Sequence, residues 1–240
     1  MIRGALIEND DMELSAMLLF WSWVFLLLGV ATCLVIAADV RKRPQHMAVM
    51  NVTWPITGLY MPILGWWAYS RMGRMPPANE QHADHGHHHG GDKPKWQGVF
   101  VSATHCGGGC TLGDVVAAPL ATATGFALFG SEIAGHFVLA FIAAYAFGVL
   151  FQYLPIRAMS DSSPGEALRN AIKADTGSLV AFQIGMYVWM LIAAFGWMGG
   201  TLDAFTPQFW FMMQIAMLVG FATSYPANWI LVERGIKHAM

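Results

Sequence analysis

The arrangement of apolar stretches constrains this chain more than any other feature of its sequence. Six segments of mainly apolar residues are each long enough to cross the hydrocarbon core of a bilayer as a helix, which takes roughly 20 residues. Charged residues make up only 12% of the chain, about half the share found in soluble domains. We therefore predict an all-α, polytopic membrane protein with about six transmembrane helices. The predicted spans are residues 14–38, 49–70, 111–130, 133–155, 179–199 and 208–231.

A polar segment near the middle of the chain divides it into parts. Residues 71–97 combine Pro, Gly and His with few apolar residues, a composition typical of disordered linkers. This predicts three units, namely an N-terminal two-helix membrane hairpin at 1–70, a disordered His-rich linker at 71–97 and a four-helix membrane domain at 98–240.

A second polar segment has the pattern of a helix start. Ser163 is a candidate N-cap, Pro164 fits the first helical position, and Glu166 fits the acidic partner of a capping box. We expect a short helix on the membrane surface over 163–175.

The positions of Lys and Arg give conflicting indications of orientation. With six spans, both termini, the linker and residues 156–178 share one side, which carries ten of the 13 basic residues. The positive-inside rule then places that side in the cytoplasm. However, the basic cluster at 41–43 directly follows the first predicted helix on the other side and favours the reverse orientation. We favour the first of these two orientations.

The stretch HCGGGCTLGD at 105–114 carries the candidate chemistry. Three glycines in a row cost about 1 kcal/mol each in a helix interior relative to Ala. We therefore expect a helix break at 107–109 and a new helix that starts with Thr111 as N-cap and Asp114 as its capping-box acid. Cys110 would then lie at or beside a helix N-terminus, where the helix dipole favours a thiolate.

The side chains of this stretch suit a soft metal ion. Imidazole nitrogen together with thiolate sulfur favours Cu(I) or Zn(II) over Mg²⁺ or Ca²⁺. Two other interpretations remain open, namely redox cycling of the two thiols and a plain helix break that buries both cysteines as small apolar residues. We prefer the metal because a His adjoins the first Cys and more candidate ligands occur elsewhere. The proposed ligands here are His105, Cys106, Cys110 and Asp114.

Further candidate ligands lie in two other places. Glu132 and His136 are four residues apart at the start of a predicted helix and so share one face. Helix geometry puts Glu132 about 28 Å from Cys110, so two metal sites along a path fit better than one shared site. The linker holds histidines that would collect Zn or Cu weakly. They are His82, His85, His87, His88 and His89.

The HCGGGCTLGD stretch, followed by four predicted spans, resembles a family of bacterial inner-membrane proteins described only as a domain of unknown function. Members of that family carry an HCGxGCxLGD-like stretch in the same place. The resemblance covers about residues 98–235. It implies a multi-pass protein of the bacterial inner (cytoplasmic) membrane and supports His105, Cys106, Cys110 and Asp114 as site residues, but it implies no activity.

Together these features predict a membrane protein that binds or transports a transition metal ion, Cu or Zn, through the His-rich collecting loop and the Cys/His site. The alternatives are a membrane thiol–disulfide redox protein and an accessory membrane subunit of a larger complex. The net charge of −2 offers no basic surface for nucleic acid. Expected partners are the lipid bilayer, metal ions and a second copy of the chain, since small-residue faces favour self-association. An enzyme is less expected, because no phosphate loop, dinucleotide fingerprint or Ser/His/Asp pattern occurs.

Overall fold

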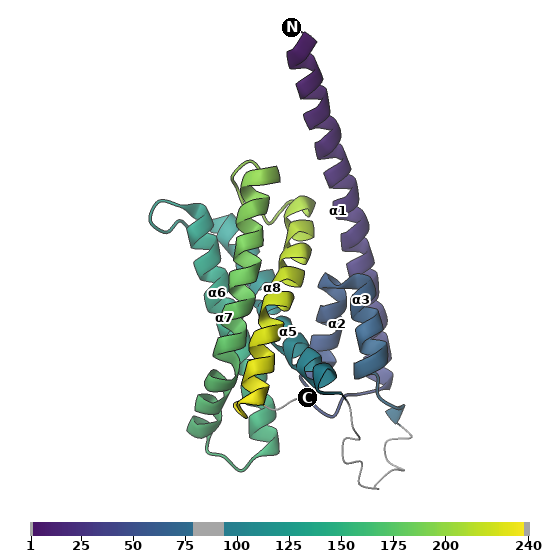
Figure 1. The fold of residues 1–240 in the computed structure, drawn as a ribbon, viewed down its shortest axis with the longest axis vertical. Coiled ribbons are helices and arrows are strands. Elements are labelled where there is room, and N and C mark those ends of the chain that lie inside the picture. The colour runs from purple at the N-terminus through teal and green to yellow at the C-terminus, as the bar shows by residue number, and fades with distance from the viewer. Residues whose placement is uncertain (1, 79–93, 238–240) are drawn as a thin grey trace.

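The computed structural model describes residues 2–78 and 94–237. Regular structure in these residues is helical apart from one isolated β-bridge between Leu128 and Ser131, so the predicted all-α class is confirmed (Figure 1). The elements are α1 (Ile2–Lys42), α2 (Met50–Tyr60), α3 (Pro62–Ala68), a π-helical turn η1 (Tyr69–Gly73), α5 (Lys95–Thr124), α6 (Glu132–Met159), α7 (Pro164–Trp197) and α8 (Pro207–Glu233).

Four helices of the described residues are long and apolar enough to cross a membrane. They are Glu13–Lys42 of α1 and the whole of α6, α7 and α8. These helices contain the predicted spans 14–38, 133–155 and 208–231 and most of 179–199, since α7 ends at Trp197. Consecutive helices of the C-terminal part pack side by side, α5 against α6 and α7 against α8 (Figure 1). By length and composition these four helices indicate a helical membrane protein, as predicted, while the six predicted spans are not confirmed.

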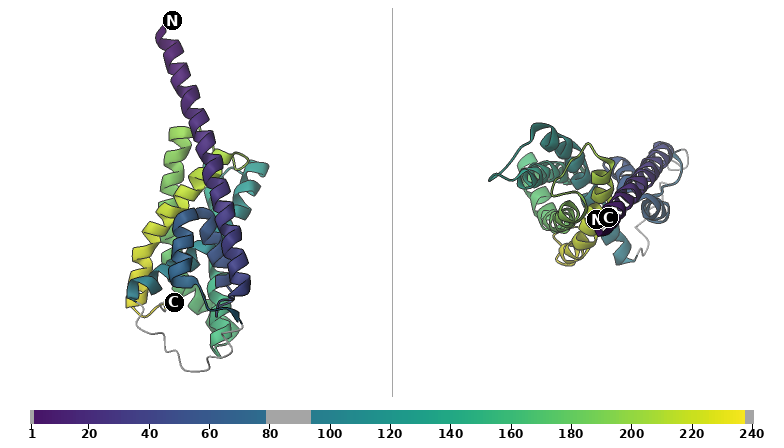
Figure 2. Two further views of the ribbon diagram at one scale, coloured as in Figure 1. Left: turned by 90° about the vertical axis from the view of Figure 1, so that its right-hand side faces the viewer. Right: turned by 90° about the horizontal axis from the view of Figure 1, so that it is seen from above.

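The predicted transmembrane helix at 49–70 is wrong, because this segment forms a helical hairpin. The chain leaves the helical region at Met61 (φ −123°, ψ 70°), and α3 then runs back beside α2 (Figure 2). Pro62 explains the turn, since it disfavours the helical region for the preceding residue and suits the first position of a new helix. Gly65 lets the two helices approach, because a Cβ there would lie 3.0 Å from the carbonyl oxygen of Thr57. With 11 residues, α2 rises only about 16 Å and does not span.

The helix break expected at 107–109 is also wrong. α5 is continuous from Lys95 to Thr124 through all three glycines. Thr111 is no N-cap, because its hydroxyl donates a hydrogen bond back to the carbonyl oxygen of Gly107 at 2.7 Å. The 30 residues of α5 extend about 45 Å, and the helix runs obliquely through the molecule (Figure 1).

The predicted capping box at Ser163 is confirmed, but the short surface helix is not separate. Ser163 Oγ accepts a hydrogen bond from the Glu166 backbone, and Glu166 Oε2 accepts one from the Ser163 backbone. The helix that begins there is α7, which continues without interruption to Trp197.

Helices also extend into the predicted linker at 71–97, since η1 ends at Gly73 and α5 begins at Lys95. The five linker histidines lie outside the described residues.

The α2–α3 hairpin determines which side each loop occupies. Because α3 returns to the end where α2 begins, the end of α1, the start of α5 and the end of α8 all lie at one end of the molecule, and the start of α1 lies at the other (Figure 1). All described Lys and Arg residues except Arg3 are near this end, which we term the basic end. The conflict between the 41–43 cluster and the other basic residues arises only if 49–70 spans the membrane.

We predict that the basic end faces the cytoplasm and that the N-terminus lies on the opposite side, because Lys and Arg next to spans are retained in the cytoplasm. Epitopes placed at each terminus and in the α7–α8 turn near Gly199 can be tested for protease access in right-side-out vesicles. The N-terminal and Gly199 epitopes should be cleaved and the C-terminal epitope protected. Protection of both termini would instead support six spans.

Candidate functional site

Two cysteines and an aspartate form one strip along α5. Cys106, Cys110 and Asp114 follow one another at intervals of four residues, which keeps them within about 80° around the helix axis. All three are buried, with at most 1% of each residue exposed. The two thiols lie one turn apart on the same side of α5, and the carboxylate of Asp175 on α7 lies against Gly148 of α6, the residue on which Gly109 packs. The strip therefore faces α7 in the interior of the bundle.

The glycines around the thiols are contact points for neighbouring helices. A Cβ on Gly109 would lie 2.8 Å from the Cα of Gly148 on α6, and a Cβ on Gly108 would lie 2.9 Å from a side-chain carbon of Thr53 on α2. Gly107 approaches the hydroxyl of Tyr60 at the tip of the α2–α3 hairpin in the same way. Close contact between backbones at small residues is a main source of helix association in membranes. The glycines therefore let α5 pass between its neighbours as a continuous helix.

Asp175 belongs to a buried ion pair that ties the C-terminal residues to the bundle. Lys237 Nζ lies 3.8 Å from Asp175 Oδ1, and neither side chain exposes more than 1% of its surface. The same ammonium donates a hydrogen bond to Asn228 Oδ1 on α8 at 2.9 Å. Charges are buried in proteins chiefly when they are paired, and Lys237 supplies a counter-charge close to the thiols.

His105 does not join the strip of thiols. On a continuous helix it is rotated by about 100° from Cys106, and its ring packs edge-on against Phe151 of α6. Neither ring nitrogen has a hydrogen-bond partner. Within the described residues, no three side chains of His, Cys, Asp or Glu come together as a metal-binding group. The predicted convergence of His105, Cys106, Cys110 and Asp114 relied on a flexible break, which α5 does not have.

Asp114 is buried one turn beyond Cys110, and neither of its oxygens accepts a hydrogen bond. The phenol of Tyr187 on α7 lies within range of its charge, but it donates its own hydrogen bond to the carbonyl oxygen of Phe137 at 2.8 Å. An unpartnered carboxyl group inside a membrane domain is costly and is a functional candidate by default.

Glu132 and His136 lie far from the cysteines, as the hairpin of α5 and α6 predicts. Glu132 is exposed in the first turn of α6, at the end opposite the basic end. His136 is buried, with Nε2 unpartnered and its ring against Phe209 of α8. Because Gly109 packs on Gly148 in antiparallel helices, His136 lies about 18 Å from the level of the thiols along the bundle.

Sequence reasoning missed three residues of this site, namely Tyr60, Asp175 and Lys237. Asp175 was assigned to a surface helix, and Tyr60 to the interior of a spanning helix, so neither was expected beside Cys106. Lys237 is separated from Cys106 by more than a hundred residues, and no local pattern links the two. Asp175 is the twelfth residue of α7. If α7 had been predicted as one helix, an acid at that depth would have indicated a buried functional group.

Adding one methyl group at the α5–α6 contact should destabilise the protein. In Gly113→Ala the new Cβ would lie 2.7 Å from the carbonyl carbon of Ala143. The nearest atoms are all backbone atoms of α6, which cannot move aside as the end of a side chain can. We expect a loss of about 1–3 kcal/mol, the range for overpacked sites. Gly177→Ala in α7 is the control, since its Cβ meets only ordinary contacts of 3.7 Å, and it should gain up to about 1 kcal/mol from helix propensity. Thermal unfolding in detergent compares the two, and equal stability of both variants would contradict the tight contact.

A family model for a domain of unknown function, DUF4396, matches residues 95–237. The match covers more than half of the chain and includes α5 to α8 and Lys237. The comparisons with curated proteins and with solved structures gave no significant match. The domain resemblance expected over 98–235 is confirmed, while the HCGxGCxLGD-like motif as a property of the family stays a prediction.

Proposed function

The chain belongs to the DUF4396 family, and we propose that it is a membrane protein that binds a transition metal ion, Cu(I) in preference to Zn(II), at Cys106 and Cys110 for transport or delivery. One observation carries the proposal. Two buried thiols lie on successive turns and on the same side of a continuous helix, and the carboxylate of Asp175 lies against Gly148, on which Gly109 between the two thiols packs. Thiolates are soft ligands that select Cu(I) and Zn(II).

The continuous helix favours a metal over a disulfide. Residues four apart on a helix have Cβ atoms about 5–6 Å apart, whereas a disulfide needs about 3.5–4.5 Å. Closing a bond between Cys106 and Cys110 would therefore distort α5 at the point where its glycines pack tightly. A metal ion placed between the two sulfur atoms bridges a wider gap without that distortion.

The number of donors favours Cu(I) over Zn(II). Structural zinc sites are almost always closed by four ligands, whereas within the described residues no third His, Cys, Asp or Glu joins the two thiols in a metal-binding group. A monovalent soft cation is satisfied by fewer ligands, and two sulfur atoms suffice for it. Lys237 already balances the charge of Asp175. When Cu(I) binds, both thiols lose their protons, and the positive charge of the ion offsets one of the two thiolate charges.

Buried polar groups beyond the cysteines support movement of the ion rather than storage alone. Asp114 follows the thiols along α5, His136 lies deeper toward the far end, and Glu132 is exposed there. Ionisable residues placed at successive depths of a membrane domain mark ion and proton pathways. The His-rich segment remains a proposed metal collector upstream of this path, and the bacterial inner membrane remains the proposed location.

Replacing both thiols should abolish high-affinity Cu(I) binding. We expect Cys106→Ser/Cys110→Ser to bind Cu(I) at least ~100-fold more weakly, because hydroxyls are hard donors and poor ligands for this ion. Cys33→Ser is the matched control, since Cys33 lies in α1 away from the pair, and it should bind like the wild type. Binding is measured anaerobically in detergent by competition with a chromogenic Cu(I) chelator, on protein purified without a metal-affinity step. Unchanged affinity in the double variant would contradict the proposal.

A further inference from the structure

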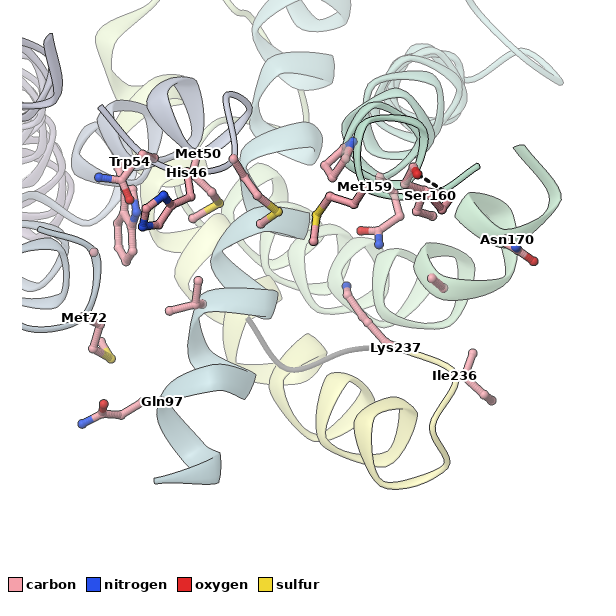
Figure 3. Close-up of a pocket in the computed structure, with 18 of the residues that line it drawn as sticks. His46, Met50, Trp54, Met72, Gln97, Met159, Ser160, Asn170, Ile236 and Lys237 are labelled. Carbon is pink, nitrogen blue, oxygen red and sulfur yellow. Dashed lines mark hydrogen bonds between the residues drawn. The ribbon is translucent and has the colours of Figure 1, made fainter. Parts of the chain in front are cut away.

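A cavity of about 890 Å³ opens at the basic end. It lies between the N-terminal hairpin and the family domain, and residues of the α1–α2 connection, η1, α5, α6, α7 and the C-terminal residues line it (Figure 3). Its inner wall includes Gln152 and Lys237. Lys237 pairs with Asp175, and Asp175 lies against Gly148, on which Gly109 of α5 packs. This cavity is therefore close to the thiol pair, on the side of the basic end.

Methionines are concentrated around this cavity. Five of its 21 lining residues are Met, against 16 in the whole chain of 240. Figure 3 shows Met50 and Met159 reaching into the cavity from opposite sides, with the His46 ring beside Met50. Thioether sulfur is an uncharged soft donor that selects Cu(I). The methionines of the cavity are Met47, Met50, Met72, Met75 and Met159.

The segment that carries two of these methionines is held by ionic hydrogen bonds. Arg74 donates to both oxygens of Asp39 at the end of α1, at 3.0 and 3.1 Å. The hydroxyl of Tyr69 donates to the same carboxylate at 2.9 Å, and Arg43 donates to the carbonyl oxygen of Met75 at 3.1 Å. Bidentate Arg–carboxylate pairs fix geometry as well as contribute energy. Met72 and Met75 are thus held on either side of an anchored Arg74.

The segment that connects α1 to α2 forms another wall of the cavity, and it also contributes two methionines. Met47 and Met50 are joined through the turn that leads into α2, where the Met50 backbone N–H donates to the Met47 carbonyl oxygen at 2.9 Å. Of the two lysines at the cavity, Lys237 is neutralised by Asp175 and Lys173 is exposed to solvent. Neither therefore places an uncompensated buried charge against a cation.

We infer that this methionine-lined cavity is a second Cu(I) site, at which the ion is held by thioethers on the cytoplasmic side before it exchanges to the thiols of Cys106 and Cys110. This second site rests on the proposed function, and it adds the thioether ligands that hold the ion before it reaches the thiols. An apolar cavity that merely holds lipid is the opposing explanation, and it makes a different prediction. Leu matches Met in size and polarity, so Met→Leu preserves a lipid pocket and removes only the sulfur.

The test compares Met47→Leu/Met50→Leu/Met75→Leu with the full-length wild type by anaerobic Cu(I) titration against a competing chelator. We expect the triple variant to bind about one ion fewer, because three of the five thioethers that line the cavity are lost. The matched control, Met186→Leu/Met190→Leu/Met213→Leu, changes three buried methionines of the core and should bind like the wild type. Met47→Leu/Met75→Leu, which leaves the buried Met50 in place, covers the case in which the triple variant does not fold, and its affinity at this site should fall at least ~10-fold.

The pH separates the two sites, because thiols must lose protons to bind metal and thioethers carry none. In Cys106→Ser/Cys110→Ser with His46→Gln added, which removes the imidazole from the lining of the cavity, the remaining bound ion should be insensitive to pH between about 6 and 8. Equal stoichiometry and affinity in the Met variants and the wild type would overturn this inference and leave the thiol site standing. Normal binding in the Cys variant, with loss in the Met variants, would overturn the proposed function instead.

Discussion

The close packing of α5 against α6 and the α2–α3 hairpin is the constraint on which the rest of the structure depends. Three consecutive glycines would favour a break in an isolated helix in water. In this bundle each glycine meets a neighbouring helix at a distance that excludes a Cβ atom. The packing stabilises a continuous helix, and the helix in turn sets the positions of the thiols. With a break, Cys110 would start a helix near the surface, whereas with a continuous α5 it is buried beside Cys106.

The hairpin at 49–70 has a comparable effect on orientation. Pro62 turns the chain at Met61, so a segment with the length and apolarity of a span returns to its starting side. This turn places the basic residues near three connections (α1–α2, η1–α5 and α6–α7) and those of the C-terminal residues at one end of the molecule. It also places Tyr60 against Gly107 and gathers methionines from the N-terminal unit around the cavity.

Sequence patterns predicted the features that depend on local physical chemistry. Hydropathy identified the four apolar helices, and the capping box at Ser163 was correct because a cap involves only neighbouring residues. The errors arose where distant segments compensate a local cost. The break at 107–109 was expected from the propensity of glycine alone, and the partners that offset this cost are Gly148 and Thr53 on other helices. The pairing of Asp175 with Lys237 is likewise a property of the fold, which no spacing in the sequence reveals.

We propose that a rigid pair of thiols, buried in a membrane domain, is the tightest metal site of the protein. X-ray absorption at the copper edge, on full-length protein loaded anaerobically with one equivalent of Cu(I), tests this most directly. We predict about two sulfur neighbours for the ion, and a spectrum that changes on Cys106→Ser/Cys110→Ser but not on the methionine substitutions. A spectrum dominated by nitrogen neighbours, or one that the cysteine substitutions leave unchanged, would contradict the account.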